Sequence, residues 1–139
     1  IDYGTMYSQD RIKYLRPENA TYPYTVEYKY TVDLKQTFFI PTWAVDNINI
    51  SYEQTECKVI TPLDYKLNYK EYNITNPASI SNNGKEKTYI WSIKNLLANR
   101  DEDYSDYTKP NIPLIRFSSD NFVFKGTTGS LKSWKEFEQ

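Results

Sequence analysis

Apolar and polar residues alternate along much of the chain. The clearest alternation runs from Tyr24 to Val32, where every second residue is tyrosine or valine and the residues between are Thr, Glu or Lys. A period of two places the apolar side chains on one face of an extended backbone. The segment therefore predicts a strand with one face in the core and the other in solvent.

Weaker signals of the same kind recur downstream. The alternation is shorter in residues 48–52 and 65–69, and strand-like apolar runs occupy residues 57–60, 89–93 and 122–124. Turn-forming residues separate these runs at intervals of about ten residues. Short strands at such intervals predict an all-β fold, which we expect to be a two-sheet antiparallel immunoglobulin-like β-sandwich.

The Asn83-Gly84 pair predicts a hairpin turn. Both residue types tolerate the positive φ of a type I′ turn, whose twist matches that of the flanking strands. We expect this turn to join a strand near residues 69–74 to a strand at residues 88–93.

The helical signal is confined to the C-terminal end. Residues 133–136, Ser-Trp-Lys-Glu, match a capping box, in which a serine cap is followed three residues later by glutamate. A helix that stops at Gln139 is too short to be stable alone, so we expect it to continue into a further segment. The predicted organisation is a β-sandwich accessory domain over residues 1–130 and the start of a linker helix over residues 131–139.

The composition narrows the possible chemistry. The chain has 139 residues, of which 14 are tyrosine and none is histidine. Without histidine it cannot form a Ser-His-Asp triad, a Cys-His dyad or a HExxH zinc site. A net charge of −1 with no long basic run argues against nucleic acid as a partner. The longest apolar runs are far shorter than the ~20 residues that span a bilayer.

The remaining reactive side chains offer no strong candidate site. Cys57 lies beside Glu56 and has no histidine to deprotonate it, so we expect an inert strand residue rather than a nucleophile. The acidic residues 101–106 fail the EF-hand pattern, because Asp106 stands where glycine is needed and Ile112 where the bidentate acid is needed. The sequence identifies no particular pair of acidic residues as the two carboxylates that glycoside hydrolysis requires. We expect no catalytic residue, no metal and no cofactor.

The aromatic residues are the remaining candidates for recognition. Trp91 lies in the middle of a predicted strand and is expected to belong to the core. Trp43 follows the Phe38-Phe39-Ile40 run at a predicted strand edge or loop, and Trp134 lies on the predicted C-terminal helix. Because tyrosine and tryptophan stack on sugars and anchor protein interfaces, Trp43 and Trp134 are the candidate interaction residues.

Four ordered parts of the chain resemble one family. They are residues 14–18 (Tyr-Leu-Arg-Pro-Glu), 24–30 (Tyr-Thr-Val-Glu-Tyr-Lys-Tyr), 89–96 (Tyr-Ile-Trp-Ser-Ile-Lys-Asn-Leu), and Phe122 with residues 126–137 (Gly-Thr-Thr-Gly-Ser-Leu-Lys-Ser-Trp-Lys-Glu-Phe). Together they resemble the bacterial domain of unknown function that precedes transglutaminase-like domains in secreted or envelope proteins, frequent in Bacteroides-type organisms. Two departures from the family pattern, Leu97 for proline and Glu138 for glycine, bear on local loop and helix-end geometry.

The resemblance implies a β-sandwich that is not itself the catalyst. In that family the Cys-His-Asp machinery lies in the following domain, and a chain without histidine fits this division. The resemblance also implies a periplasmic, cell-surface or secreted location, with a following transglutaminase-like domain as the partner in the same polypeptide.

From these observations we predict a non-catalytic accessory domain of a secreted or envelope transglutaminase-like or protease-like protein. It would position the catalytic domain, or bind its substrate or a partner. Two alternatives remain open: a carbohydrate-binding module that uses exposed aromatic residues, and an adhesin-like structural subunit. We expect a monomer without a membrane span that binds no nucleic acid and whose ligand, if it has one, is a protein or a glycan.

Overall fold

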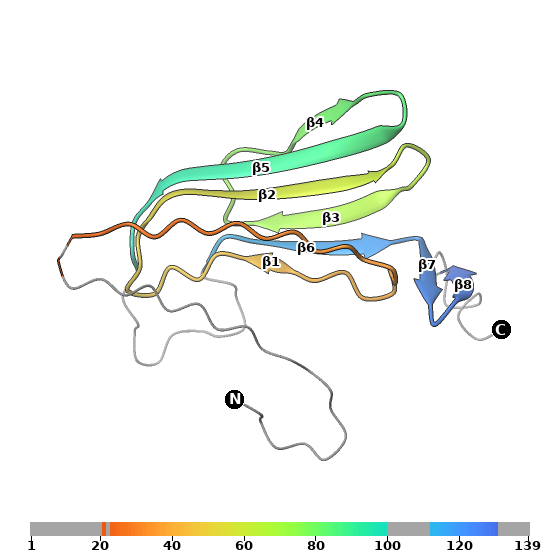
Figure 1. Cartoon of the computed structure of the whole chain (residues 1–139), viewed down its shortest axis with the longest axis horizontal. Helices are drawn as coiled ribbons and strands as arrows, with labels where there is room; N and C mark the ends of the chain where they lie inside the picture. The colour runs from red at the N-terminus through yellow and green to blue at the C-terminus, as the bar shows by residue number, and fades with distance from the viewer. Residues whose placement is uncertain (1–20, 22, 100–111, 131–139) are drawn as a thin grey trace, which may run out of the picture. The chain divides into compact units, whose positions relative to one another are not determined.

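The computed structural model describes residues 21, 23–99 and 112–130. The chain divides into two units, residues 1–33 and residues 34–139. All of the strands described below belong to the second unit (Figure 1). The described residues are all-β and include no helix.

The described residues of the second unit form two antiparallel sheets of three strands and a small two-stranded sheet. The first sheet has the order β1-β6-β3, the second β2-β5-β4, and the third pairs β7 with β8 (Figure 1). The strands are β1 (Trp43–Ala44), β2 (Tyr52–Pro62), β3 (Leu67–Tyr72), β4 (Ser79–Asn82), β5 (Glu86–Leu96), β6 (Leu114–Ser119), β7 (Asn121–Phe124) and β8 (Thr127–Ser130).

The longest ladder joins β2 to β5, and each of these strands has 11 residues. Inward side chains such as Cys57 and Val59 alternate in β2 with exposed ones such as Glu56 and Lys58. This is the period expected of a sheet with one buried face. The strands predicted at residues 57–60 and 89–93 are confirmed, and both extend beyond their apolar runs.

One hydrophobic core connects the two three-stranded sheets. Its buried members are Tyr89 and Trp91 from β5, Leu67 from β3 and Ile115 from β6. Trp91 and Ile115 are completely inaccessible to solvent. The rings of Tyr69, Tyr89 and Phe117 surround Trp91, with centroids 5.1, 6.1 and 5.6 Å from it. The prediction that Trp91 is a core residue is confirmed.

The Asn83-Gly84 turn lies where it was predicted, but it joins different strands. It connects β4 to β5, so the preceding strand is Ser79–Asn82 rather than residues 69–74. Only Gly84 has a positive φ, of 83°, whereas a type I′ turn needs it at both central positions. The Asn83 side chain instead closes the turn, since its Oδ1 accepts the backbone N–H groups of Lys85 and Glu86.

The strand predicted from Tyr24 to Val32 is not formed. These residues belong to no sheet, and the five alternating apolar side chains are exposed. The rings of Tyr28 and Tyr30 do stack, with centroids 6.3 Å apart, so the alternation places neighbouring tyrosines on one side of the segment. Alternation specifies such a face, but strand formation also depends on packing against neighbours.

Two other predicted strands shift. The alternation in residues 48–52 gives only an isolated bridge from Ile48 to Asn99, and β2 starts at Tyr52. The alternation in residues 65–69 lies across the start of β3, which begins at Leu67. The strand at residues 122–124 is confirmed within β7.

The β7–β8 hairpin packs against the segment that precedes β1. The ring of Phe38 contacts those of Phe122 and Phe124, with centroids 4.7 and 5.5 Å away. The backbone N–H of Thr37 donates to the Val123 carbonyl, and its Oγ1 accepts from the Val123 N–H, both at 3.0 Å. The hairpin is therefore fixed to its own unit by hydrogen bonds as well as by apolar contact.

Some predictions concern residues outside the described part of the chain. The linker helix over residues 131–139, with Trp134, is one of them, and the acidic segment of residues 101–106 is another.

Candidate functional site

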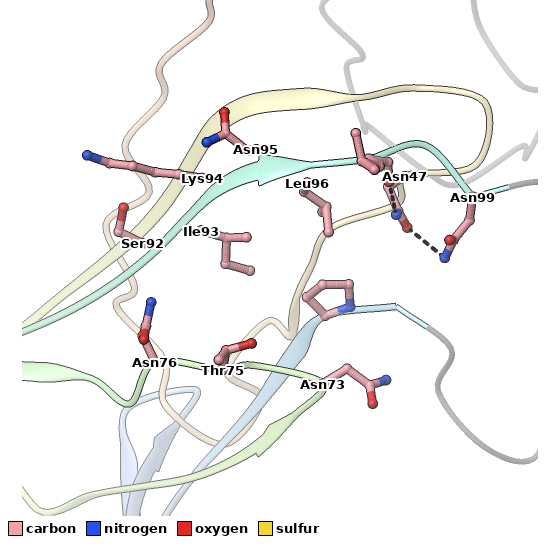
Figure 2. A pocket seen from close by; sticks show the side chains of 12 residues that line it. Asn47, Asn73, Thr75, Asn76, Ser92, Ile93, Lys94, Asn95, Leu96 and Asn99 are labelled. Atoms are coloured by element: carbon pink, nitrogen blue, oxygen red, sulfur yellow. Dashed lines mark hydrogen bonds between the residues drawn. The ribbon is translucent and has the colours of Figure 1, made fainter.

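A groove of about 630 Å³ lies along the second half of β5. Strand β5 contributes residues 92–96, the loop between β3 and β4 contributes Asn73, Thr75 and Asn76, and the remaining wall comes from Asn47, Leu97, Asn99 and Pro113 (Figure 2). The groove therefore depends on segments that are far apart in the sequence.

A network around Asn47 builds one end of the groove. The Asn47 side chain is buried, and its Nδ2 donates a 2.8 Å hydrogen bond to the Leu97 carbonyl. The backbone carbonyl of Asn47 accepts from the N–H of Asn99 at 2.8 Å, and the Asn99 side chain approaches Asn47 Oδ1 at 3.5 Å (Figure 2). Because a buried amide needs partners, we assign Asn47 a structural role.

Two asparagines of the groove have a left-handed backbone. Asn73, at the end of β3, has φ 53°, and Asn95, within β5, has φ 54°. This conformation is uncommon outside glycine, and asparagine tolerates it better than most residues. The Asn73 side chain donates to the Ile112 carbonyl at 3.2 Å and so ties the β3 end to the segment before β6.

Several polar groups of the groove are not used by the fold. The side chains of Thr75, Asn76, Ser92, Lys94 and Asn95 make no hydrogen bond with any described residue. A carboxamide both donates and accepts, and a hydroxyl does the same. These side chains therefore retain hydrogen-bonding capacity for a ligand.

Apolar side chains lie between these polar groups. Figure 2 shows Ile93 and Leu96 on β5 across from Thr75 and Asn76 on the β3–β4 loop. Lys94 is the charged residue of the lining, which contains no carboxylate. Mixed amide, hydroxyl and aliphatic surfaces suit a ligand that is uncharged, rich in hydrogen-bonding groups and apolar on one face.

The lining of the groove contains no carboxylate, cysteine or tyrosine, and its one ionisable side chain is that of Lys94. A carboxylate pair is absent from its lining, and the described residues contain no cluster of three or more potential metal ligands. Cys57 lies elsewhere, half-buried in β2, and burial together with the Glu56 charge raises its pKa to about 11. A raised pKa disfavours the thiolate and therefore nucleophilic attack.

Trp43 lies in β1 and pairs with Ile115 of β6. Its indole is half-buried and packs against the core, so only part of the ring is accessible. Trp43 does not line the groove, and Trp134 lies outside the described residues. Their role as interaction residues stays a prediction.

Sequence reasoning missed the groove. In the sequence, Asn73, Asn76 and Asn95 read as ordinary turn or surface residues, because their side chains come together only through the pairing of the strands that carry them. The cluster of asparagines near the predicted strand ends was the one available signal.

Within the described residues, no helix is long and apolar enough to cross a membrane.

A family model described as "Domain of Unknown Function with solved-structure structure (DUF3857)" matches residues 2–99. The chain belongs to the DUF3857 family. The expectation of a domain of unknown function is thereby confirmed, whereas the bacterial origin and the association with transglutaminase-like domains stay predictions. Comparison with curated proteins and with solved structures gave no match.

The DUF3857 match covers β1 to β5 and every residue lining the groove except Pro113. It ends before β6, although β6 lies between β1 and β3 in the first sheet. The matched residues therefore need the following segment to complete that sheet.

Proposed function

We propose that this DUF3857 chain is a non-catalytic accessory domain that binds a substrate or partner through the groove along β5. The observation that carries the proposal is the chemistry of the groove. It offers free amide and hydroxyl groups beside aliphatic side chains, with no carboxylate among its lining residues. Such a surface is suited to recognition rather than to proton transfer.

The wider context of the proposal comes from the resemblance. The domain would act beside a transglutaminase-like or protease-like domain of a bacterial secreted or envelope protein, in the periplasm or at the cell surface. Membership of a family of unknown function is compatible with this assignment. We also propose that the two facing sheets form an immunoglobulin-like sandwich, which is supported by their antiparallel pairing and shared core.

The test measures turnover and binding on the same purified chain. We expect no peptidase, transglutaminase or glycosidase turnover, and we expect binding to unfolded polypeptide or to neutral oligosaccharides that weakens in Asn76→Ala and Asn95→Gly. Asn95→Gly removes the amide but keeps the positive φ accessible. Asn49→Gly is the matched control, because Asn49 has φ 59° but does not line the groove. Robust turnover abolished by one substitution would contradict the proposal.

The carbohydrate-binding alternative has two forms that the same experiment separates. If glycans stack on exposed aromatic residues, glycan binding should be lost in Trp43→Ala and retained in Asn95→Gly. Glycans bound in the groove should show the opposite pattern, since no lining residue of the groove is aromatic.

The adhesin-like alternative requires strand addition between chains. It predicts open-ended assembly that grows with concentration, which light scattering would detect as a mass that never levels off.

A further inference from the structure

The outer edge of β2 carries the second proposal, which is independent of the groove. Strand β2 pairs with β5 on one side, and the described residues place no strand on its other side. The proposal concerns residues 54–60, in the middle of this 11-residue strand. An edge stretch that has no neighbouring strand is a template for an additional strand unless the protein protects it.

The charges on this edge select which strand can be added. Glu56 and Lys58 are exposed and flank Cys57. Across β5 they face the uncharged residues Ser92 and Ile90, so neither has an opposite charge directly across the existing ladder. A lysine in an edge strand normally discourages pairing, unless the incoming strand presents an acid opposite it.

We propose that β2 pairs antiparallel with β2 of a second copy of this chain, about a two-fold axis at Cys57. In this register Glu56 of each copy lies opposite Lys58 of the other, with Cβ atoms about 4.5–5.5 Å apart. The contact is self-complementary, as a closed two-fold dimer requires. It joins the two β2-β5-β4 sheets into one continuous sheet.

Neighbouring registers are disfavoured by the same charges. An axis at Glu56 would place Glu56 opposite its own copy, and an axis at Lys58 would place two lysines opposite each other. Like charges directly opposite destabilise a ladder. Among these three registers, the Glu-Cys-Lys sequence therefore favours the one with its axis at Cys57. The proposal differs from the monomer expected from the sequence, and the tests below decide between the two.

The first test is the mass of the full chain in solution. Sedimentation equilibrium at increasing protein concentration should show the mass rising from 16.5 kDa and levelling off at twice that value. Lys58→Glu and Glu56→Lys should each keep the chain monomeric, because each places like charges opposite each other. The double exchange, Glu56→Lys with Lys58→Glu, should restore the dimer. Lys85→Glu, in the β4–β5 turn, makes the same change of net charge away from the edge and should dimerise like the wild type.

The second test fixes the register chemically. In a Cys57→Ala background, Gln54→Cys with Ile60→Cys places each new thiol opposite its counterpart in the other copy, and both positions are exposed. Mild oxidation should give a covalent dimer. Gln54→Cys alone keeps both charges but faces Ile60 of the other copy in this register, so it should not cross-link. Circular dichroism and thermal unfolding establish that every variant is folded.

Three results would overturn the proposal: a wild-type chain that stays monomeric at all concentrations, a dimer that survives both single charge reversals, or a dimer that the double exchange fails to restore.

Discussion

The indole Nε1 of Trp91 donates a 2.6 Å hydrogen bond to the Oε1 atom of Glu71. Trp91 lies on β5 and Glu71 on β3, so this bond joins the two three-stranded sheets. It satisfies the polar atom of a completely buried indole, whose ring also contacts Tyr69, Tyr89 and Phe117. Trp91 therefore contributes both ring packing and a hydrogen bond to the core that joins the two sheets.

Removing the Trp91 side chain should therefore destabilise the chain strongly. We expect Trp91→Ala to lower the free energy of unfolding by about 3–5 kcal/mol, the range for deleting a large buried aromatic. Trp91→Phe keeps most of the apolar contact and loses the bond to Glu71, so its effect should be smaller, about 1–3 kcal/mol. Urea unfolding measures both, with Lys85→Ala as an exposed control. Equal effects of Trp91→Ala and Lys85→Ala would refute the core assignment.

Gly129 lies directly against the ring of Phe122 in the β7–β8 hairpin. A Cβ added at Gly129 would collide with ring atoms of Phe122. We expect Gly129→Ala to cost about 1–3 kcal/mol, because relief requires a shift of a packed ring or of the strand. Thr128→Ala, at an exposed neighbouring position, is the control. Thermal unfolding in which both variants match the wild type would show that this contact does not constrain the hairpin.

Asn95 should tolerate glycine better than alanine. Its φ of 54° lies in the left-handed region, where a Cβ costs about 1–2 kcal/mol and glycine avoids that cost. We therefore expect Asn95→Ala to unfold at a lower temperature than Asn95→Gly. At Lys94, whose φ is not positive, the order of stability should reverse. The same order at both positions would contradict a left-handed Asn95.

Cys57 should react slowly with alkylating reagents in the folded chain. Burial, with the Glu56 charge as the second cause, raises its pKa from 9.0 to about 11, so the thiolate is scarce at pH 8. Iodoacetamide labelling should accelerate as the pH rises toward 11 and be fast at pH 8 after unfolding in urea. Labelling at equal rates in the folded and unfolded chains would show that the thiol is not held in the core.

The same pKa shift predicts a pH dependence of stability. Well below pH 9 the thiol is almost entirely neutral in both states and contributes almost no pH dependence. Between pH 9 and about 11 it ionises in the unfolded state first, so stability falls as the pH rises. Tyrosines also titrate in this range. The pH dependence of the free energy of unfolding should therefore be compared with that of Cys57→Ala, in which the part due to the thiol should be absent.

The sequence predicted the all-β class and the central strands because their apolar residues fill a core. Trp91 and Phe122 lie in strands where their neighbours predicted them. Strand β4 was missed because its sequence, Ser-Ile-Ser-Asn, is mostly polar, and it is a strand only through pairing with β5. The opposite error occurred at residues 24–32, where strong alternation does not produce a strand. In both cases the deciding factor is a neighbouring strand, which local pattern does not encode.

The groove was less accessible to sequence reasoning than the fold. Aromatic residues attracted attention because of their size, yet Trp43 packs against the core and does not reach the groove. The groove is lined instead by asparagines, which in a sequence are interpreted as turn-forming residues and not as binding residues. Only the register of β5 and the path of the β3–β4 loop bring Asn76 and Asn95 into one surface.

The central claim, that the chain recognises a ligand without transforming it, is tested most directly by NMR titration of the labelled chain. Neutral oligosaccharides and an unfolded polypeptide are the probes, and ligand signals are followed in the same samples. The account predicts concentration-dependent shifts in the side-chain amides of Asn76 and Asn95 for one of these ligand classes, with ligand signals that stay unchanged over days. New product signals, shifts centred on Trp43 instead of the groove, or a groove that responds to neither class would contradict it.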